Sequence, residues 1–314
     1  MPTQTTKTAA SLALAVLLIA SARANATSLR TFVSGTGSDS NPCTRTAPCA
    51  TLAGALVNTT TSGEVYILDA GDYSSSGGTT TISQPVSIIG AGARGGITGT
   101  VVINTTGFVL LKGLDIDAEL GPGIQATVGG SNLTVDDCTI VNGLWGINFE
   151  PTTSSTPSFL VVRNSVISNC SFTLIPNTTP AGIMLAGSSA GAVYATVDNV
   201  MLNGNWHGVY ALDYTNVTIR NSDITQNSHS GLRAETDNGG AVNAFVEHSH
   251  ATHNLGNGVL AVNTGATIRL SEVAITDNVN GIHYQTGGAV ISFGNNSVDG
   301  NTSSLAPTST VALQ

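Results

Sequence analysis

A short phrase recurs along most of this 314-residue chain: a small inward-facing hydrophobe, a few polar residues, an Asn, and then Gly followed by an alternating run. Successive phrase glycines lie 23, 36, 26, 23, 27 and 23 residues apart, at Gly123, Gly146, Gly182, Gly208, Gly231, Gly258 and Gly281. The runs between the turns have the two-residue alternation of β-strands and no helical period. Such a repeat predicts an all-β chain that winds as a parallel β-solenoid.

The repeat divides the chain into regions. Residues 64–301 follow it and predict about ten coils. Residues 25–63 predict a strand, a loop and, over 50–58, a short amphipathic helix that caps the first coil and protects its open edge. The tail, 302–314, lacks the repeat and is expected to cover the far end. The long step after Gly146 predicts a loop over Phe172–Pro180 on one side of the rod.

The first 24 residues are typical of a signal peptide. Lys7 supplies a positive charge, Ala9–Ala20 is apolar, and Ala22-Arg23-Ala24 has the small-x-small pattern of a cleavage site. The apolar run is too short to span a membrane, so the mature chain is expected to be exported. The net charge of −9 becomes −11 once Lys7 and Arg23 are removed, leaving 8 basic and 19 acidic residues. This charge excludes nucleic acid as a partner, because little would neutralise phosphates.

The four cysteines fall into two groups. Cys43 and Cys49 lie in a turn-rich segment of a chain predicted to be exported, which predicts a local disulfide. Cys138 and Cys170 fall in different columns of the repeat. We expect them to be separate buried thiols, with a bridge between them as the alternative.

Aligning the repeats places residues of successive coils above one another. One column alternates in charge and predicts a structural ladder, because opposite charges on neighbouring strands stabilise a sheet: Lys112, Asp136, Arg163, Asp198, Arg220, Glu247 and Arg269. The next column predicts an asparagine ladder at a bend: Asp137, Asn164, Asn199, Asn221 and His248. His248 then replaces an Asn and is not expected to be a ligand.

A third column places Asp223, His250 and Glu272 on consecutive coils, with the imidazole between two carboxylates. Such a trio is a candidate for acid–base catalysis, and the alternative is a solvated stack of ion pairs. The histidines at 248, 250 and 253 also suggest zinc. However, alternation sends neighbouring residues to different faces and no further ligands complete a site, so no metal site is predicted.

After the phrase glycines, alternation brings polar and aromatic residues to one outer face, and two more lie at the turn just before Gly208. This set predicts a surface that stacks on sugars and hydrogen-bonds to them: Trp206, His207, Tyr210, Arg233, Glu235 and His283. The alternative is an ordinary mixed β-sheet surface with no ligand.

The N-terminal segment carries a resemblance to a known family. Its motifs are Phe32-Val33-Ser34, the loop with Asp39 and Asn41, Pro48-Cys49-Ala50-Thr51-Leu52 and Gly71-Asp72-Tyr73. Together with the repeats they resemble exported proteins of the pectin-lyase-like superfamily. The resemblance covers essentially the whole mature chain and implies a right-handed parallel β-helix.

The resemblance also implies a carbohydrate ligand, either a polysaccharide or a cell-surface glycan. The sequence favours a noncatalytic surface or glycan-binding rod, since the catalytic motifs of the superfamily are incomplete. The alternative is a polysaccharide lyase or glycoside hydrolase that acts on an acidic polysaccharide. No cofactor is expected for the rod, whereas a lyase would call for calcium. The oligomeric state, monomer or trimer, stays open.

Overall fold

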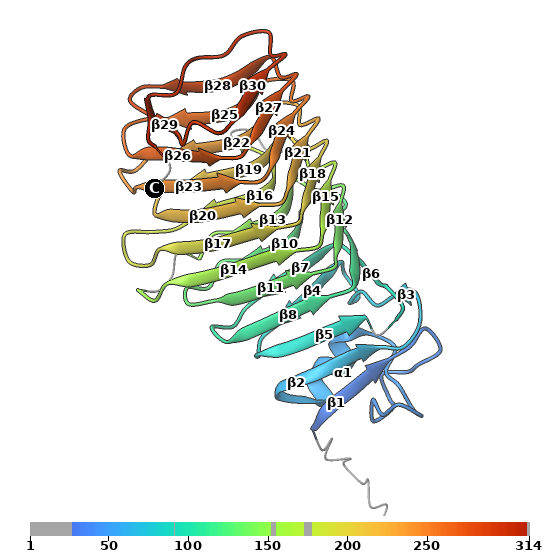
Figure 1. Cartoon of the computed structure of the whole chain (residues 1–314). Coiled ribbons are helices and arrows are strands. Elements are labelled where there is room, and N and C mark those ends of the chain that lie inside the picture. The colour runs from blue at the N-terminus through green and yellow to red at the C-terminus, as the bar shows by residue number, and fades with distance from the viewer. Residues whose placement is uncertain (1–26, 91, 152–154, 173–177, 313–314) are drawn as a thin grey trace, which may run out of the picture.

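The structure is a computed structural model that describes residues 27–312 except 91, 152–154 and 173–177. The predicted signal peptide, 1–24, and most of the predicted loop at 172–180 therefore lie outside the described residues. Figure 1 shows a rod of stacked parallel strands that runs from the N-terminal elements at one end to β28 and β30 at the other. The predicted solenoid, of about 10 turns, is confirmed.

Three parallel sheets run along the rod in the described residues, and each coil visits them in the same order. The first sheet has 12 strands: β1 (Ser28–Val33), β2 (Thr59–Ile67), β5 (Val86–Gly90), β8 (Phe108–Lys112), β11 (Asn132–Asp136), β14 (Ser158–Arg163), β17 (Val193–Asp198), β20 (Thr215–Arg220), β23 (Val242–Glu247), β26 (Ala266–Ser271), β29 (Ala289–Ser292) and β31 (Ser309–Thr310).

The second sheet that a coil enters has 10 strands: β3 (Gly71–Asp72), β6 (Gly95–Thr98), β9 (Leu114–Asp117), β12 (Thr139–Val141), β15 (Val166–Ser168), β18 (Met201–Asn203), β21 (Asp223–Thr225), β24 (His250–Thr252), β27 (Ala274–Thr276) and β30 (Ser297–Asp299). The third sheet has 9 strands: β4 (Thr79–Ile82), β7 (Thr100–Ile103), β10 (Pro122–Ala126), β13 (Trp145–Phe149), β16 (Ala181–Ala186), β19 (His207–Leu212), β22 (Ser230–Glu235), β25 (Asn257–Val262) and β28 (Asn280–Gln285).

A single apolar core fills the space between the sheets along the rod. Its side chains come mainly from alternate strand positions and stack coil upon coil, as Ile140, Ile167, Leu202 and Ile224 do in the 10-stranded sheet. The strands carry β-branched residues at these positions because such side chains pack well on a pleated surface. The core is therefore narrow and built mostly from Val, Ile, Leu and Ala.

The helix α1 (Leu52–Asn58) lies at the N-terminal end of the rod beside β1 and β2 (Figure 1). Thr51 caps it by accepting a hydrogen bond from the Gly54 N–H, and the Asp39 carboxylate accepts the Ala50 and Thr51 N–H groups. Leu52 and Ala55 are fully buried against the core. No helix in the described ranges is long and apolar enough to cross a membrane.

The cysteines lie as predicted. Cys43 and Cys49 form a disulfide in the segment before α1, and both are buried. Cys138 and Cys170 are separate buried thiols. Burial raises the pKa of Cys138 to about 11 and that of Cys170 to about 12, so both thiols stay protonated at neutral pH.

The phrase glycines allow the coils to approach closely at the start of the 9-stranded sheet. A Cβ on Gly208 would lie 2.4 Å from Ile224 Cγ2 and 2.6 Å from the Gly231 carbonyl oxygen. A Cβ on Gly231 would likewise lie 2.7 Å from the Gly258 carbonyl oxygen. Any larger residue would push neighbouring backbones apart, which explains why glycine recurs once per coil.

The Asn of the repeated phrase forms a ladder inside the rod that the sequence did not reveal. In each step an amide Nδ2 donates to the Oδ1 of the next coil over 2.9 Å, through Asn227, Asn254, Asn278 and Asn301. The same side-chain amides also bond to backbone carbonyl and N–H groups at this turn. These buried backbone groups therefore have hydrogen-bond partners.

The predicted asparagine ladder lies at a different, outer turn. Its members Asp137, Asn164, Asn199, Asn221 and His248 all have positive φ, between 46 and 55°. Asn199 donates to Asn164 over 2.9 Å, whereas Asn164 and Asn221 donate to aspartates of the charge ladder. This turn selects Asn and Asp mainly because they tolerate the left-handed conformation.

Candidate functional site

Two outward columns of the 9-stranded sheet carry the predicted sugar-binding residues. Strand pairing places Met184, Tyr210, Arg233, Leu260 and His283 in one column. Leu212, Glu235, Val262 and Gln285 form the column beside it. His283 therefore lies two coils beyond Arg233, with Leu260 between them, and is separate from the other predicted residues.

Tyr210, Arg233 and Glu235 form the centre of the site. The Tyr210 hydroxyl donates to Glu235 Oε2 over 2.5 Å, and Arg233 Nη2 lies 2.6 Å from the same oxygen. The Arg233 guanidinium also lies 5.1 Å from the centre of the Tyr210 ring. Burial and the bond to Glu235 raise the pKa of Tyr210, so its hydroxyl remains a donor at neutral pH. Both donors hold Glu235 in one position.

Aromatic rings lie against this centre. Trp206 stacks on His229 with ring centres 5.6 Å apart, and His207 lies 5.3 Å from the Tyr210 ring and 4.7 Å from the His229 ring. Sequence reasoning missed His229, although it precedes the same sheet one coil later. The structure thus brings together Trp206, His207, Tyr210, Arg233 and Glu235; we call these five and His229 the Tyr210 cluster.

The imidazole of His207 is unusual because it is fully buried. Neither ring nitrogen makes a hydrogen bond of ordinary geometry to a described residue. Burial lowers the pKa of His207 to about 2, assisted by the nearby His229 and Arg233. The ring is therefore neutral at neutral pH.

Two further carboxylates lie at the edge of the cluster, and sequence reasoning missed both. Asp213 accepts the backbone N–H groups of Asp237, Asn238 and Gly240 at 3.0–3.2 Å, which folds the turn after β22 back onto the turn after β19. Burial, followed by the charges of Glu235 and Asp213, raises the pKa of Asp237. Asp237 therefore holds a proton more readily than an ordinary aspartate.

This arrangement separates the roles of two neighbouring carboxyl groups. Glu235 accepts a hydrogen bond from the Tyr210 hydroxyl and pairs with the Arg233 guanidinium, while the pKa of Asp237 is raised. Paired acids whose surroundings differ in this way are suited to general acid and general base chemistry at one bond.

The predicted trio of Asp223, His250 and Glu272 does not form. His250 Nδ1 lies 2.7 Å from Asp223 Oδ1, as expected for adjacent coils. However, His250 pairs with Ala274 on the next coil, so the prediction that Glu272 lies beside it is wrong. Glu272 lies in the preceding turn, where its carboxylate is 2.6 Å from His248 Nε2. Asp223 and His250 are 53% and 59% exposed, as in a solvated surface pair.

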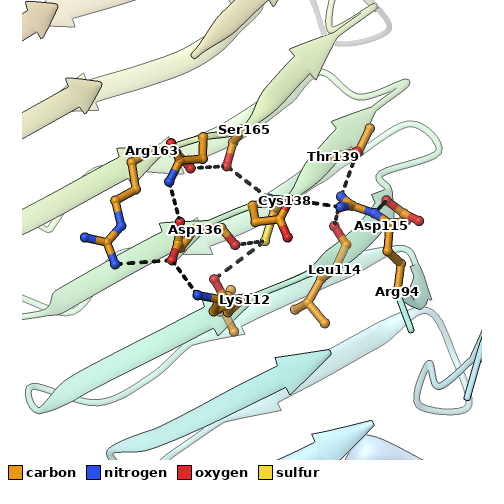
Figure 2. A network of polar contacts seen from close by, with 12 residues as sticks. Arg94, Lys112, Leu114, Asp115, Asp136, Cys138, Thr139, Arg163 and Ser165 are labelled. Carbon is orange, nitrogen blue, oxygen red and sulfur yellow. Dashed lines mark hydrogen bonds and ion pairs between the residues drawn. The ribbon is translucent and has the colours of Figure 1, made fainter. Parts of the chain in front are cut away.

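The charge ladder is confirmed except at its last member. Strand pairing aligns Lys112, Asp136, Arg163, Asp198, Arg220 and Glu247, but Ser271 follows in place of Arg269. Arg269 pairs instead with Phe245. Figure 2 shows Asp136 between Lys112 and Arg163, each 3.2 Å from the same carboxylate oxygen.

Arg94 extends the polar network toward the 10-stranded sheet. It contacts Asp115 and Asp137, and its guanidinium also donates to Thr139 (Figure 2). These contacts connect turns of three coils and are fully used within the protein, which indicates a structural role. Among the described residues, no group of three His, Cys, Asp or Glu side chains is placed to hold a metal ion.

Comparisons with known proteins agree with this architecture. A family described as "Right handed beta helix region" matches residues 181–264. No curated protein matches the sequence of the chain. Several solved structures share its fold.

A pectate lyase has a TM-score of 0.59 at 15% identity, over 90% of this chain and 80% of its own. A rhamnogalacturonan lyase has a TM-score of 0.55 at 14% identity, over 91% and 85%. A lacto-N-biosidase from Eubacterium ramulus has a TM-score of 0.52 at 11% identity, over 91% and 68%. The chain therefore shares the right-handed parallel β-helix fold of these structures, and the predicted fold is confirmed. By name, these structural neighbours are carbohydrate-active enzymes.

Proposed function

We propose that this protein is an exported glycoside hydrolase that cleaves a polysaccharide at the Tyr210 cluster. The observation that carries the proposal is the Glu235 carboxylate, held by Tyr210 and Arg233 beside an Asp237 whose pKa is raised. Three proteins of the same fold are named for cleaving carbohydrates, which supports a glycan substrate. The Cys43–Cys49 disulfide is consistent with export.

In the proposed reaction, water attacks the anomeric carbon while the bond from that carbon to the leaving sugar oxygen breaks. Glu235 takes the proton from the attacking water, and Asp237 gives its proton to the leaving oxygen. Tyr210 and Arg233 position the Glu235 carboxylate. Trp206 and His229 offer a flat apolar surface beside the reacting bond, on which a sugar ring can lie.

Hydrolysis fits this site better than elimination. A lyase of this fold would need an unpaired Lys or Arg to remove a proton from the sugar. The arginine of the cluster, Arg233, is paired with Glu235 and is not free for that role at this site. The second candidate function is the noncatalytic glycan-binding rod predicted from the sequence. It is favoured by exposed aromatic rings on another face, at Phe159 and Tyr194.

The test is an assay of the mature chain on pectate, rhamnogalacturonan, alginate and uncharged polysaccharides. New reducing ends report hydrolysis, and absorbance of unsaturated sugars reports elimination. Glu235→Gln and Asp237→Asn should each lower the hydrolysis rate roughly 100-fold or more.

Two exposed carboxylates give matched controls: Asp223→Asn and Glu272→Gln should keep the full rate. Unsaturated products, or a rate lost with Asp223→Asn, would refute the proposed site. If no polymer is cleaved, the noncatalytic rod becomes the better account.

A further inference from the structure

The outer face of the 12-stranded sheet holds a groove that the Tyr210 cluster does not use. The groove has a volume of about 360 Å³ and crosses β14, β17, β20, β23 and β26. Strand pairing stacks Phe159, Tyr194, Asn216 and Asn243 along one side of it. Thr218, Phe245 and Arg269 follow one another along the column beside them.

One end of the groove is aromatic. The rings of Phe159 and Tyr194 lie 5.6 Å apart at 19° to each other, so they form one stacked platform. They are 47% and 45% exposed in a chain whose residues are only 5% aromatic. Exposed rings leave apolar area in water, and the apolar face of a sugar ring can pack against such rings.

The other end carries a guanidinium with no carboxylate partner. Arg269 Nη1 donates to Asn243 Oδ1 over 3.3 Å, and Arg269 makes no ion pair among the described residues. On the same sheet, Arg163 and Arg220 are both paired with aspartates of the charge ladder. Glu247, the acidic residue of the strand beside Arg269, pairs in register with Ser271 instead.

The charge of the groove differs from that of the whole protein. The chain has a net charge of −9, yet the residues that line the groove include Arg269 and no carboxylate. The groove is thus complementary to a single negative charge placed beside a flat apolar body. Asn216 and Asn243, joined by a 3.3 Å hydrogen bond, add amide donors and acceptors suited to hydroxyl groups.

We propose that this groove binds a glycan whose sugars carry a carboxylate. One sugar ring stacks on Phe159 and Tyr194, the neighbouring hydroxyls bond to Asn216 and Asn243, and a carboxylate pairs with Arg269. The site lies on a different sheet from the Tyr210 cluster, so it would hold the polymer whether or not the cluster cleaves it. It goes beyond the proposed hydrolysis and does not depend on it.

The test measures the affinity of tetragalacturonate by calorimetry, with its carboxyl-reduced form as the uncharged probe. The Glu235→Gln chain is used to prevent turnover. Arg269→Gln should weaken tetragalacturonate binding roughly tenfold to a hundredfold, because a charge-assisted bond is lost. Tyr194→Ala should weaken both probes. Arg220→Gln removes the same charge from the ladder and should change affinity less than about threefold.

The reduced probe should bind the parent chain about as weakly as tetragalacturonate binds Arg269→Gln. Asp223→Asn, on the 10-stranded sheet, should leave the affinity unchanged, which separates this groove from another outer face of the rod. Equal binding of the two probes, or affinity lost equally with Arg220→Gln and Arg269→Gln, would overturn the proposal. So would an affinity unchanged by Tyr194→Ala, or no binding of either probe to a chain with native circular dichroism.

Discussion

The side-chain amide of Asn227 donates to Asn254 Oδ1 over 2.9 Å, although the two residues are 27 positions apart. Asn254 also accepts the Asn227 backbone N–H and donates to the Ile224 carbonyl. All of these groups are buried, so each depends on the ladder for its hydrogen bond.

Asn254→Leu should therefore destabilise the protein by roughly 2–5 kcal/mol, because it leaves buried polar groups without partners. Chemical denaturation followed by circular dichroism measures the loss. Asn132→Ala, at an exposed strand position, should cost less than about 0.5 kcal/mol. Equal losses in the two variants would contradict a role for the inner ladder in stability.

Asp136→Asn should destabilise the protein by roughly 1–3 kcal/mol, since Lys112 and Arg163 lose the carboxylate between them. The Asp136 side chain is only 5% exposed. Burial opposes its charge, but bonds from Asn164, Arg163 and Lys112 outweigh burial and lower its pKa. Its contribution is thus present above the unfolded pKa and is lost as pH falls through the lowered folded pKa.

The control for this prediction is Asp223→Asn, which removes an exposed ion pair and should change stability by less than about 0.5 kcal/mol. Both variants are measured by denaturation in low and high salt. If Asp223→Asn lowered the free energy of unfolding as much as Asp136→Asn, burial would not determine how much these ion pairs contribute to stability.

Acid should weaken the fold partly through His207. The pKa of His207 is about 2 in the folded protein, whereas the pKa of an unfolded histidine is about 6.5. Below the unfolded value the unfolded chain binds one more proton, so stability falls as pH decreases, by up to about 1.4 kcal/mol per pH unit. His229, whose pKa burial also lowers, adds to the same trend.

In the His207→Leu variant, the number of protons that the chain takes up on unfolding should fall by one between pH 6 and about pH 4. Stability should therefore depend less steeply on pH. Denaturant unfolding at several pH values measures the slope. Asn132→Ala changes an exposed residue without a titratable side chain and should leave the slope as it was. An unchanged slope in the His207 variant would show that the imidazole is protonated in the folded protein.

The thiols give a simple prediction. A thiol reagent should find no reactive cysteine in the native protein and two in the unfolded, unreduced chain, namely Cys138 and Cys170. Removing the disulfide with Cys43→Ala and Cys49→Ala should lower the free energy of unfolding by about 2 kcal/mol, because the loop that the disulfide closes is short. Four thiols in the unfolded chain would refute the disulfide.

The period of the glycines was enough to predict the coils, and alternation was enough to predict which residues face outward. Both follow from backbone geometry that repeats with every strand. The columns through Tyr210 and Arg233 were right for this reason. The sequence could not show that the Tyr210 hydroxyl and the Arg233 guanidinium both contact the Glu235 carboxylate, because side-chain direction depends on neighbouring coils.

The errors at Arg269 and Glu272 have one cause. The similar sequences around Arg220 and Arg269 were aligned, yet Arg220 is the last residue of β20 and Arg269 is the fourth of β26. A slip of one residue would have put core residues outside, but a slip of two preserves the alternation. The inward and outward pattern therefore could not reveal the mistake.

The shared register has a further consequence for how such a rod changes over evolution. His250 occupies the place of Asp223 one coil later. Excising residues 223–249 would therefore join Ser222 to His250. Each later strand would still have a neighbouring strand to pair with in the same register. The helical cap and the opposite terminus would be untouched, while Arg233 and Glu235 would be gone. Length and chemistry can thus be gained or discarded one module at a time.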